Sequence, residues 1–363
     1  MASKSMKLLS IIFVSVLMLS ACHTPPPPQS HTSDVWQVAW SPDGHTIATG
    51  SWDHTVNLWN AKSGQLIHTL RGYSDVIVGL AWSPDSTFIA AGDKAGKLIV
   101  WDAQTGKSQR TLEGEMAAWS PDGKTLATWF YYSAGKARSL WNWQTGGLLC
   151  AMELGPDSRI SSAAWSLDGT KLAFVWGGAA IGRLDAKSCN DIWPEPPPGP
   201  MTSRESSIIV IAWSPNGKMV AGGSYDGPVF IWDVQKAGEP TTTFWKHIKR
   251  TGSVAWSPDS RLLASGASDG TIIIWDVKAE QPLLTLLGCP QPKGDPPPPQ
   301  PPCEPKNSSE VLSGYIDGAT SVAWSPDGKT LATAGFGFHS AEGPVEAVRL
   351  WDIATAKLVA TFK

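Results

Sequence analysis

A six-residue segment returns seven times along this chain of 363 residues. The first copy reads Ala-Trp-Ser-Pro-Asp-Gly at 39–44, and the others begin at Ala81, Ala118, Ala164, Ala212, Ala255 and Ala323. Leu167 replaces Pro, Asn216 replaces Asp, and Ser86 and Ser260 replace Gly. The Trp residues of successive copies are 42, 37, 46, 48, 43 and 68 residues apart. A period of this length indicates a repeat architecture, in which neighbouring units stack to bury a shared core.

A second residue recurs at a nearly constant distance after the first Trp of each unit. It follows that Trp by 19 residues in five units, by 22 in the third and by 27 in the seventh. It closes an apolar or β-branched run and is filled by Trp59, Trp101, Trp141, Leu184, Trp232, Trp275 and Trp351. In six units this residue is a Trp followed by Asp or Asn. Two landmarks in phase define seven homologous units.

The first unit predicts four short strands joined by tight turns. Residues 35–40, 46–50, 55–59 and 65–70 are short apolar or β-branched runs separated by turn-forming residues. Pro presets φ in such turns and Gly accepts a positive φ. A lone four-stranded sheet (strands a to d) cannot bury both of its faces, whereas radial stacking buries them. We therefore expect an all-β, seven-bladed β-propeller of four-stranded antiparallel blades over residues 34–363.

The Trp-Asp ends of strand c and the Ser-Pro-Asp-Gly turns resemble the WD-repeat β-propeller family, over about residues 31–363. The resemblance implies a polar network in each unit, in which a His contacts an Asp of the b–c turn, a Ser or Thr of strand b and the strand-c Trp. Two units hold the full set, namely His31, Thr49, Asp53 and Trp59 in the first and His247, Ser265, Asp269 and Trp275 in the sixth. Tyr73 and Tyr315 replace the His in two other units.

Ring closure is expected to depart from the pattern of many family members, which complete the last blade with a strand from the N-terminus. Val35 already begins strand a of the first blade, and residues 358–362 supply strand d of the seventh. We therefore predict a ring that closes without strand exchange.

The N-terminal segment predicts an export signal. Lys4 and Lys7 precede an apolar stretch at 8–19, which suits a signal peptide and is too short to span a bilayer. The quartet Leu-Ser-Ala-Cys at 19–22 resembles the bacterial lipobox, which implies a lipoprotein signal peptide at 1–21, a lipidated Cys22 and a Pro-rich tether at 22–33. The alternative is ordinary secretory cleavage with Cys22 left as a thiol. Lipidation implies an extracytoplasmic protein of the bacterial envelope, on the outer membrane facing the periplasm or, with one membrane, at the cell surface.

Four further cysteines follow. Cys289 and Cys303 bracket the Pro-rich run 290–302, within an insertion at 288–312, which predicts a disulfide between them. Cys150 falls in strand d of blade 3 and Cys189 at the c–d turn of blade 4. Because the outer strands of neighbouring blades splay apart, we expect these two to be separate thiols, with a second disulfide as the alternative.

Sequence motifs for catalysis or cofactor binding are weak. Residues 266–270 spell the Gly-x-Ser-x-Gly of hydrolases, but they form the b–c turn of blade 6, and that motif needs a strand-to-helix turn. No metal-ligand or phosphate-loop pattern occurs, so we expect no metal and no cofactor. Removal of 1–21 would leave 29 − 2 = 27 basic and 32 acidic residues, a net charge of −5, which argues against a nucleic-acid partner. The basic run at 246–250 is read as a solvated loop.

Aromatic residues recur in the b–c segments, which share one face of the ring with the d–a connections. They are Trp52, Tyr131, Tyr132, Trp176, Tyr225, Phe336 and Phe338. Aromatic loop residues suit a protein-binding surface, although each could instead pack between blades. We therefore expect a monomeric, non-enzymatic scaffold that binds a protein or peptide through this face. The alternative is a propeller that binds a small ligand or carbohydrate, or acts as a hydrolase, at its central channel.

Overall fold

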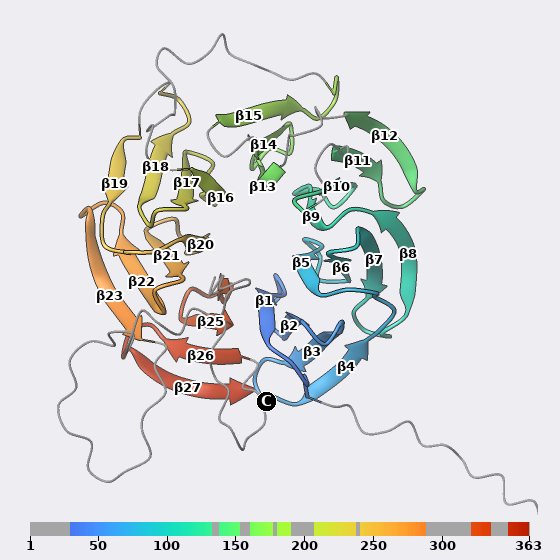
Figure 1. The fold of residues 1–363 in the computed structure, drawn as a ribbon, viewed down its shortest axis with the longest axis horizontal. Coiled ribbons are helices and arrows are strands. Elements are labelled where there is room, and N and C mark those ends of the chain that lie inside the picture. The colour runs from blue at the N-terminus through green and yellow to red at the C-terminus, as the bar shows by residue number, and fades with distance from the viewer. Residues whose placement is uncertain are drawn as a thin grey trace, which may run out of the picture.

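The computed structural model describes residues 30–132, 138–152, 160–176, 180–189, 207–236, 240–287, 321–334 and 348–362. Within these ranges the chain forms 27 strands in seven antiparallel sheets and no helix. Figure 1 shows the sheets arranged as blades around a central axis, with the first blade (blue) beside the last (red). The predicted seven-bladed propeller is confirmed.

Each blade is built from strands that follow one another in the sequence. Blade 1 comprises β1 (Val35–Trp40), β2 (Thr46–Ser51), β3 (Val56–Asn60) and β4 (Leu66–Leu70). Blade 2 comprises β5 (Ile77–Trp82), β6 (Phe88–Asp93), β7 (Lys97–Asp102) and β8 (Ser108–Glu113). Blade 3 comprises β9 (Met116–Trp119), β10 (Thr125–Trp129), β11 (Arg138–Asn142) and β12 (Gly147–Met152).

The remaining blades follow the same order. Blade 4 has three described strands, β13 (Ile160–Trp165), β14 (Lys171–Trp176) and β15 (Ala180–Asp185). Blade 5 comprises β16 (Ile208–Trp213), β17 (Met219–Ser224), β18 (Val229–Asp233) and β19 (Thr242–Phe244). Blade 6 comprises β20 (Thr251–Trp256), β21 (Leu262–Ala267), β22 (Thr271–Asp276) and β23 (Gln281–Leu287). Blade 7 comprises β24 (Ser321–Trp324), β25 (Thr330–Ala334), β26 (Val348–Asp352) and β27 (Lys357–Phe362).

The ring closes by direct packing of blade 1 against blade 7. β27 is the fourth strand of blade 7, and within the described residues that sheet holds β24 to β27 and no strand from the N-terminal part of the chain. Val35, Val38 and Trp59 of blade 1 share one buried apolar cluster with Leu350 and Phe362 of blade 7. The backbone N–H of Val38 also donates to the Ser321 hydroxyl of blade 7 at 3.2 Å.

The repeated strand-a Trp residues join neighbouring blades. The indole N–H of five of them donates to the carbonyl of the repeated Ala in the preceding blade, at 2.9–3.2 Å; these are Trp82, Trp119, Trp165, Trp256 and Trp324. The indole nitrogens of Trp40 and Trp213 are buried and have no hydrogen-bond partner among the described residues. The junctions of blade 7 with blade 1 and of blade 4 with blade 5 therefore lack this bond.

The Ser-Pro-Asp-Gly segments are the a–b turns of the blades and all lie on one face of the ring. In the first turn the Ser41 hydroxyl donates to Asp43 at 2.6 Å, and the same bond recurs in the other six blades, with Asn216 as the acceptor in blade 5. Two departures from the repeat add bonds between blades. Ser86 accepts from the Asp43 backbone N–H of blade 1, and Ser260 accepts from the Asn216 backbone N–H of blade 5, each at 3.0 Å. Both Ser residues keep the positive φ (61°) that the replaced Gly would adopt.

In blades 1 to 4 the c–d turn lies against the outer strand of the neighbouring blade. Gly106 (blade 2) packs on His68 of β4, and Gly146 (blade 3) packs on Arg110 of β8. Cys189 holds the same turn position in blade 4, with a positive φ of 58°. Its equivalent neighbour on β12 is Cys150, and the two form a disulfide with Cα atoms 6.3 Å apart. The expectation of separate thiols was wrong, because it compared outer strands with each other and overlooked this turn-on-strand contact.

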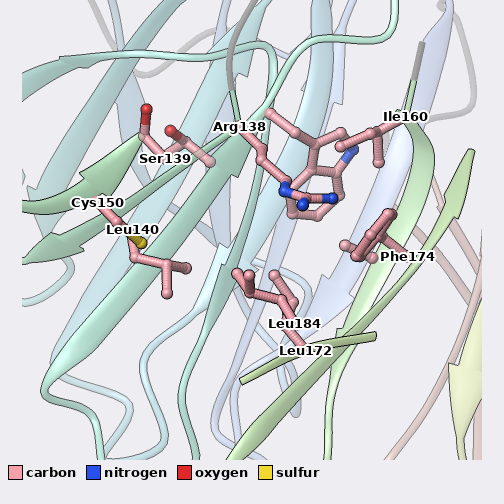
Figure 2. A pocket seen from close by; sticks show the side chains of 11 residues that line it. Arg138, Ser139, Leu140, Cys150, Ile160, Leu172, Phe174 and Leu184 are labelled. Atoms are coloured by element: carbon pink, nitrogen blue, oxygen red, sulfur yellow. The ribbon is translucent and has the colours of Figure 1, made fainter. Parts of the chain in front are cut away.

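A small cavity beside this disulfide belongs to the packing between blades 3 and 4. Figure 2 shows Arg138, Leu140 and Cys150 of blade 3 on one side and Phe174 of blade 4 on the other. Its volume is about 10 Å³, far below the roughly 300–1,000 Å³ of ligand pockets. The Arg138 guanidinium lies 4.0 Å from the centre of the Phe174 ring and is buried there. This cation–π contact stabilises the junction.

Candidate functional site

All seven blades contribute to a cavity at one mouth of the central channel. It occupies about 150 Å³ where the strand-a segments begin, on the face of the b–c and d–a connections. Its lining includes Trp36 of blade 1, Val78 of blade 2, Met116, Tyr131 and Tyr132 of blade 3, Ser161 of blade 4, Ile209 of blade 5, Arg250 of blade 6 and Ser321 of blade 7. The site can therefore contact a ligand from every direction around the axis.

Aromatic rings form two groups at this mouth. Trp52, predicted for this face, stacks on Trp36 with ring centres 5.9 Å apart and planes at 27°. Tyr131 and Tyr132, also predicted, meet edge to face at 4.8 Å. Sequence reasoning missed Trp36, because it considered b–c turns and not the first residues of strand a. A Trp next to the start of the first strand was the available signal.

A buried carboxylate holds the paired tyrosines in place. Glu115, at the d–a connection into blade 3, is fully buried. Its Oε2 accepts from the backbone N–H of Tyr131 at 2.7 Å and from that of Tyr132. Lys94 of blade 2 lies over the Tyr132 ring, with its Nζ 4.9 Å from the ring centre. These contacts fix the position of the tyrosine pair relative to the channel.

Arg250 is the one Lys, Arg, His, Asp or Glu among the described residues that line the cavity. It lies in the d–a connection into blade 6, and its carbonyl accepts from the Ser268 backbone N–H at 2.8 Å. The sequence interpretation placed it in a solvated basic loop, but the fold brings it to the channel mouth. The cavity therefore combines aromatic surface with one positive charge.

Three more apolar side chains are exposed on loops of the same face. Tyr225, predicted for this surface, is 61% exposed in the b–c turn of blade 5. Trp245 and Ile248, in the d–a connection between blades 5 and 6, are 74% and 78% exposed. The sequence prediction covered the aromatic residues of the b–c segments alone and so did not include Trp245. Large apolar groups exposed on loops are candidates for partner contact.

Several predicted residues lie outside what the structure describes. Phe336 and Phe338 fall between the described ranges, as do Cys289, Cys303 and the insertion at 288–312. Cys22 and the predicted signal peptide also precede residue 30. Trp176 ends β14, but its side chain is not described. In the described ranges, no helix has the length and apolar character needed to cross a bilayer.

The structure brings together the predicted polar network of blade 1. His31 Nε2 lies 2.7 Å from the Thr49 hydroxyl, and His31 Nδ1 lies 3.0 Å from Asp53 Oδ2. The Trp59 indole N–H donates to the same Thr49 hydroxyl at 2.8 Å. The network thus links the b–c turn to the centre of the blade.

Blade 6 repeats this arrangement. His247 Nε2 lies 2.7 Å from the Ser265 hydroxyl, and His247 Nδ1 lies 3.3 Å from Asp269 Oδ2. The Trp275 indole N–H donates to Ser265 at 2.8 Å. Asp269 therefore participates in a structural network.

The two Asp residues are held as carboxylates. Burial would raise the pKa of Asp53, but hydrogen bonds from His31 and Thr55 and the charge of His31 outweigh it and lower the pKa to about 2. Burial is likewise outweighed at Asp269, where hydrogen bonds from His247 and Thr271 lower the pKa well below its usual range. Both carboxylates stay ionised under ordinary conditions and cannot serve as general acids.

The network changes form in the other blades. In blade 2 the Tyr73 hydroxyl accepts from the Trp101 indole at 2.7 Å, so Tyr occupies the His site and contacts the Trp directly. In blades 3 and 7 the strand-c Trp residues donate to Thr128 and Thr333 at 3.0 Å. Blade 5 keeps Asp226 in its b–c turn, but the Trp232 indole nitrogen has no partner among the described residues.

The Gly-x-Ser-x-Gly segment is a strand-to-strand turn. Ser268 lies between β21 and β22, and its neighbour Asp269 contacts His247. The Ser268 hydroxyl is buried and has no hydrogen-bond partner among the described residues. The turn thus lacks the strand-to-helix geometry that exposes a hydrolase serine. Among the described side chains, no three His, Cys, Asp or Glu gather to form a metal site.

Comparisons with known proteins agree with this fold. The β-propeller domain of Cps50 (Swd1) from Myceliophteria thermophila aligns with a TM-score of 0.69, covering 89% of this chain and 98% of that one at 16% identity. WD repeat-containing protein VIP3 of Arabidopsis thaliana is 27% identical over 213 residues, which are 57% of this chain and 56% of VIP3. Protein HIRA of Zea mays is 47% identical over 36 residues, 10% of this chain and 4% of that protein. The chain thus spans about half of VIP3 and a small part of HIRA.

The family model for the WD domain, G-beta repeat, matches five segments, at 26–60, 64–102, 200–233, 238–276 and 306–338. These segments fall on blades 1, 2, 5, 6 and 7, whereas blades 3 and 4, which lack the His and Asp of the network, are not matched. The chain belongs to the WD40-repeat β-propellers.

Proposed function

We propose that this propeller is a scaffold that binds a protein or peptide at the channel mouth described above. WD40 propellers are typically protein-interaction scaffolds, and this chain shares their fold. The observation that carries the proposal is the convergence of Trp36, Tyr131, Tyr132 and Arg250, from three blades, on one cavity. Aromatic residues and Arg dominate the binding energy of protein interfaces.

The lining favours a peptide over the alternative of a channel enzyme or small-ligand binder. Hydrolases most often use a carboxylate or an imidazole as the general base, and the described lining residues supply neither. A volume of about 150 Å³ is also below that of most small-molecule pockets. One side chain or a short loop tip fits this space, while the rest of a partner would contact Tyr225 and Trp245 around it.

Site-specific crosslinking tests the proposal. A photo-crosslinking amino acid at Tyr225 should capture a discrete partner in the native host, whereas the same group at Lys329 on the opposite face should not. Tyr131→Ala with Tyr132→Ala should abolish capture from Tyr225 while the melting temperature is retained. If both positions capture the same protein, or the double variant captures normally, the channel mouth is not the binding site. If the double variant unfolds, Trp245→Ala replaces it, since Trp245 is 74% exposed.

We also propose that the chain is lipid-anchored at Cys22 and lies outside the cytoplasm. The lipobox-like quartet at 19–22 supports the anchor. The Cys150–Cys189 disulfide supports the location, since disulfides persist mainly in oxidising compartments. Labelling with an alkyne fatty acid should mark the protein, and Cys22→Ser should remove both the label and membrane association. Labelling that survives Cys22→Ser would refute the anchor without affecting the channel proposal.

A further inference from the structure

A second hollow lies on the opposite face, between blades 2 and 3. Its volume is about 430 Å³, and its lining includes Asp85, Phe88, Asp122, Lys124, Trp143 and Gln144. The a–b turns of the two blades form its sides, and the c–d turn of blade 3 contributes Trp143. This hollow is separate from the channel mouth, which lies where the strand-a segments begin.

Trp143 gives this junction an aromatic surface. Its ring lies 4.3 Å from that of Phe88 and 5.3 Å from that of Trp119, between ring centres. Side chains at the equivalent position of the other blades are small or aliphatic, namely Ala61, Ala103, Ala186, Val234, Val277 and Ile353. The fold therefore does not require an aromatic residue there. Trp143 is also only partly buried, so part of its surface remains accessible at this junction.

Two carboxylates flank the aromatic surface. The Ser83 hydroxyl donates to Asp85 Oδ1, and the Ser120 hydroxyl donates to Asp122 Oδ1, each at 2.6 Å. The backbone N–H groups of Thr87 and Lys124 donate to the same two oxygens at 3.0 Å. The hydrogen bonds within each turn thus converge on Oδ1, so that Oδ2 can accept from a ligand.

Lys124 is the opposing charge at the rim. Its side chain is exposed, and its charge acts on the neighbouring Asp122. A cationic ligand would meet two carboxylates and one ammonium group, so its net electrostatic interaction with the site remains attractive. Removal of the Lys124 charge should then strengthen the binding of a cation, so the direction of the change in affinity tests the site.

We propose that this hollow binds an arginine side chain of a protein or peptide partner. A planar guanidinium stacks on an indole ring and donates to carboxylates in a fork that an ammonium group cannot match. Trp143 supplies the stacking surface, while Asp85 and Asp122 supply the acceptors on either side. The inference goes beyond the function proposed for the channel mouth and does not depend on it.

Titration with short capped peptides tests the proposal. Acetyl-Gly-Arg-Gly-amide should bind the full chain saturably, observed in its own NMR signals and in the Trp143 signal of fluorotryptophan-labelled protein. Trp143→Ala identifies that signal. The citrulline analogue, which has the same shape without charge, should not bind, and the lysine analogue should bind about two- to fivefold more weakly. Equal binding of the citrulline peptide would overturn the proposal.

The chain itself supplies matched variants. Asn216 occupies the Asp position in blade 5 and still accepts from the Ser214 hydroxyl at 2.8 Å and the Lys218 N–H at 3.0 Å. Asp85→Asn with Asp122→Asn should therefore keep both turns and weaken arginine binding at least about fivefold. Lys124→Gln should tighten it about twofold. The control pair Asp259→Asn and Asp327→Asn should leave the affinity unchanged, and a similar loss in the control would mean nonspecific charge attraction.

Discussion

Cys189 occupies the turn position that Gly106 and Gly146 hold in blades 2 and 3, and it is bonded to Cys150 of the preceding blade. In blade 2 the turn residue Gly106 packs against His68 of blade 1, and His68 Nε2 lies 3.0 Å from the Gln104 carbonyl oxygen. In blade 3 the turn residue Gly146 packs against Arg110 of blade 2, whose guanidinium donates to the Gln144 carbonyl at 3.0 Å. The same neighbouring positions thus carry van der Waals contact, a hydrogen bond or a covalent bond.

Reduction of this disulfide should destabilise the ring. The bond closes a loop with a sequence separation of 39, for which loop entropy gives a cost of about 4 kcal/mol on removal. Urea unfolding with a reductant should reproduce the stability of Cys150→Ser. The comparison is made in a Cys289→Ser, Cys303→Ser background, where the second disulfide predicted from the sequence cannot form, and there the reductant should leave the Cys150→Ser variant unchanged.

Cys189→Gly should be less harmful than Cys189→Ser. Both variants lose the bond, but Gly also relieves the positive φ of 58°, which costs an L-residue about 1–2 kcal/mol. Equal stability of the two variants would show that the turn changes conformation when the bond is lost.

Thr49→Val should remove about 1–3 kcal/mol from the free energy of unfolding, because it leaves the Trp59 indole and His31 without their shared buried partner. Thr333→Val in blade 7 is the control, since among its described contacts it receives the Trp351 indole and no His. Its cost should be smaller. Chemical denaturation of both variants provides the comparison.

Stability should fall as the pH drops from 5 toward 2. The pKa of Asp53 is about 2 in the fold and 3.8 in its absence. A lowered folded-state pKa adds stability above the unfolded value, and this stability is lost as the pH falls through the folded value. Asp53→Asn should therefore cost stability at pH 5 and little at pH 2. In a His31→Ala background, the cost at pH 5 should shrink.

Ser86→Ala should destabilise the protein more than Ser86→Gly. Both remove the hydrogen bond from Asp43 of the neighbouring blade, but Ala keeps the positive φ of 61° that Gly accepts without strain. We expect a cost of about 1 kcal/mol for Ala relative to Gly. Thermal unfolding of the two variants measures the difference, and the reverse order would show that the backbone is not strained there.

The sequence predicted the fold in detail because its signals are local. The Ser-Pro-Asp-Gly turns and strand-c Trp residues mark strand ends, so the predicted strands of blade 1 differ from β1–β4 by one residue at most at each end. The site was harder to predict, since Trp36 and Arg250 reach the channel mouth only when the blades are stacked. The Cys150–Cys189 pair could have been predicted from spacing: Cys150 lies nine residues after Trp141, as His68 does after Trp59, and Cys189 lies five after Leu184, as Gly106 does after Trp101.

Each described sheet is made of strands that are consecutive in the chain, and the two ends of the ring meet as whole blades. The polypeptide could therefore be circularly permuted: linking residue 363 to residue 30 and cutting the d–a connection at Gly72 would leave every blade uncut. Such a permutant should refold to the same toroid, because no sheet contains strands from both sides of the new cut.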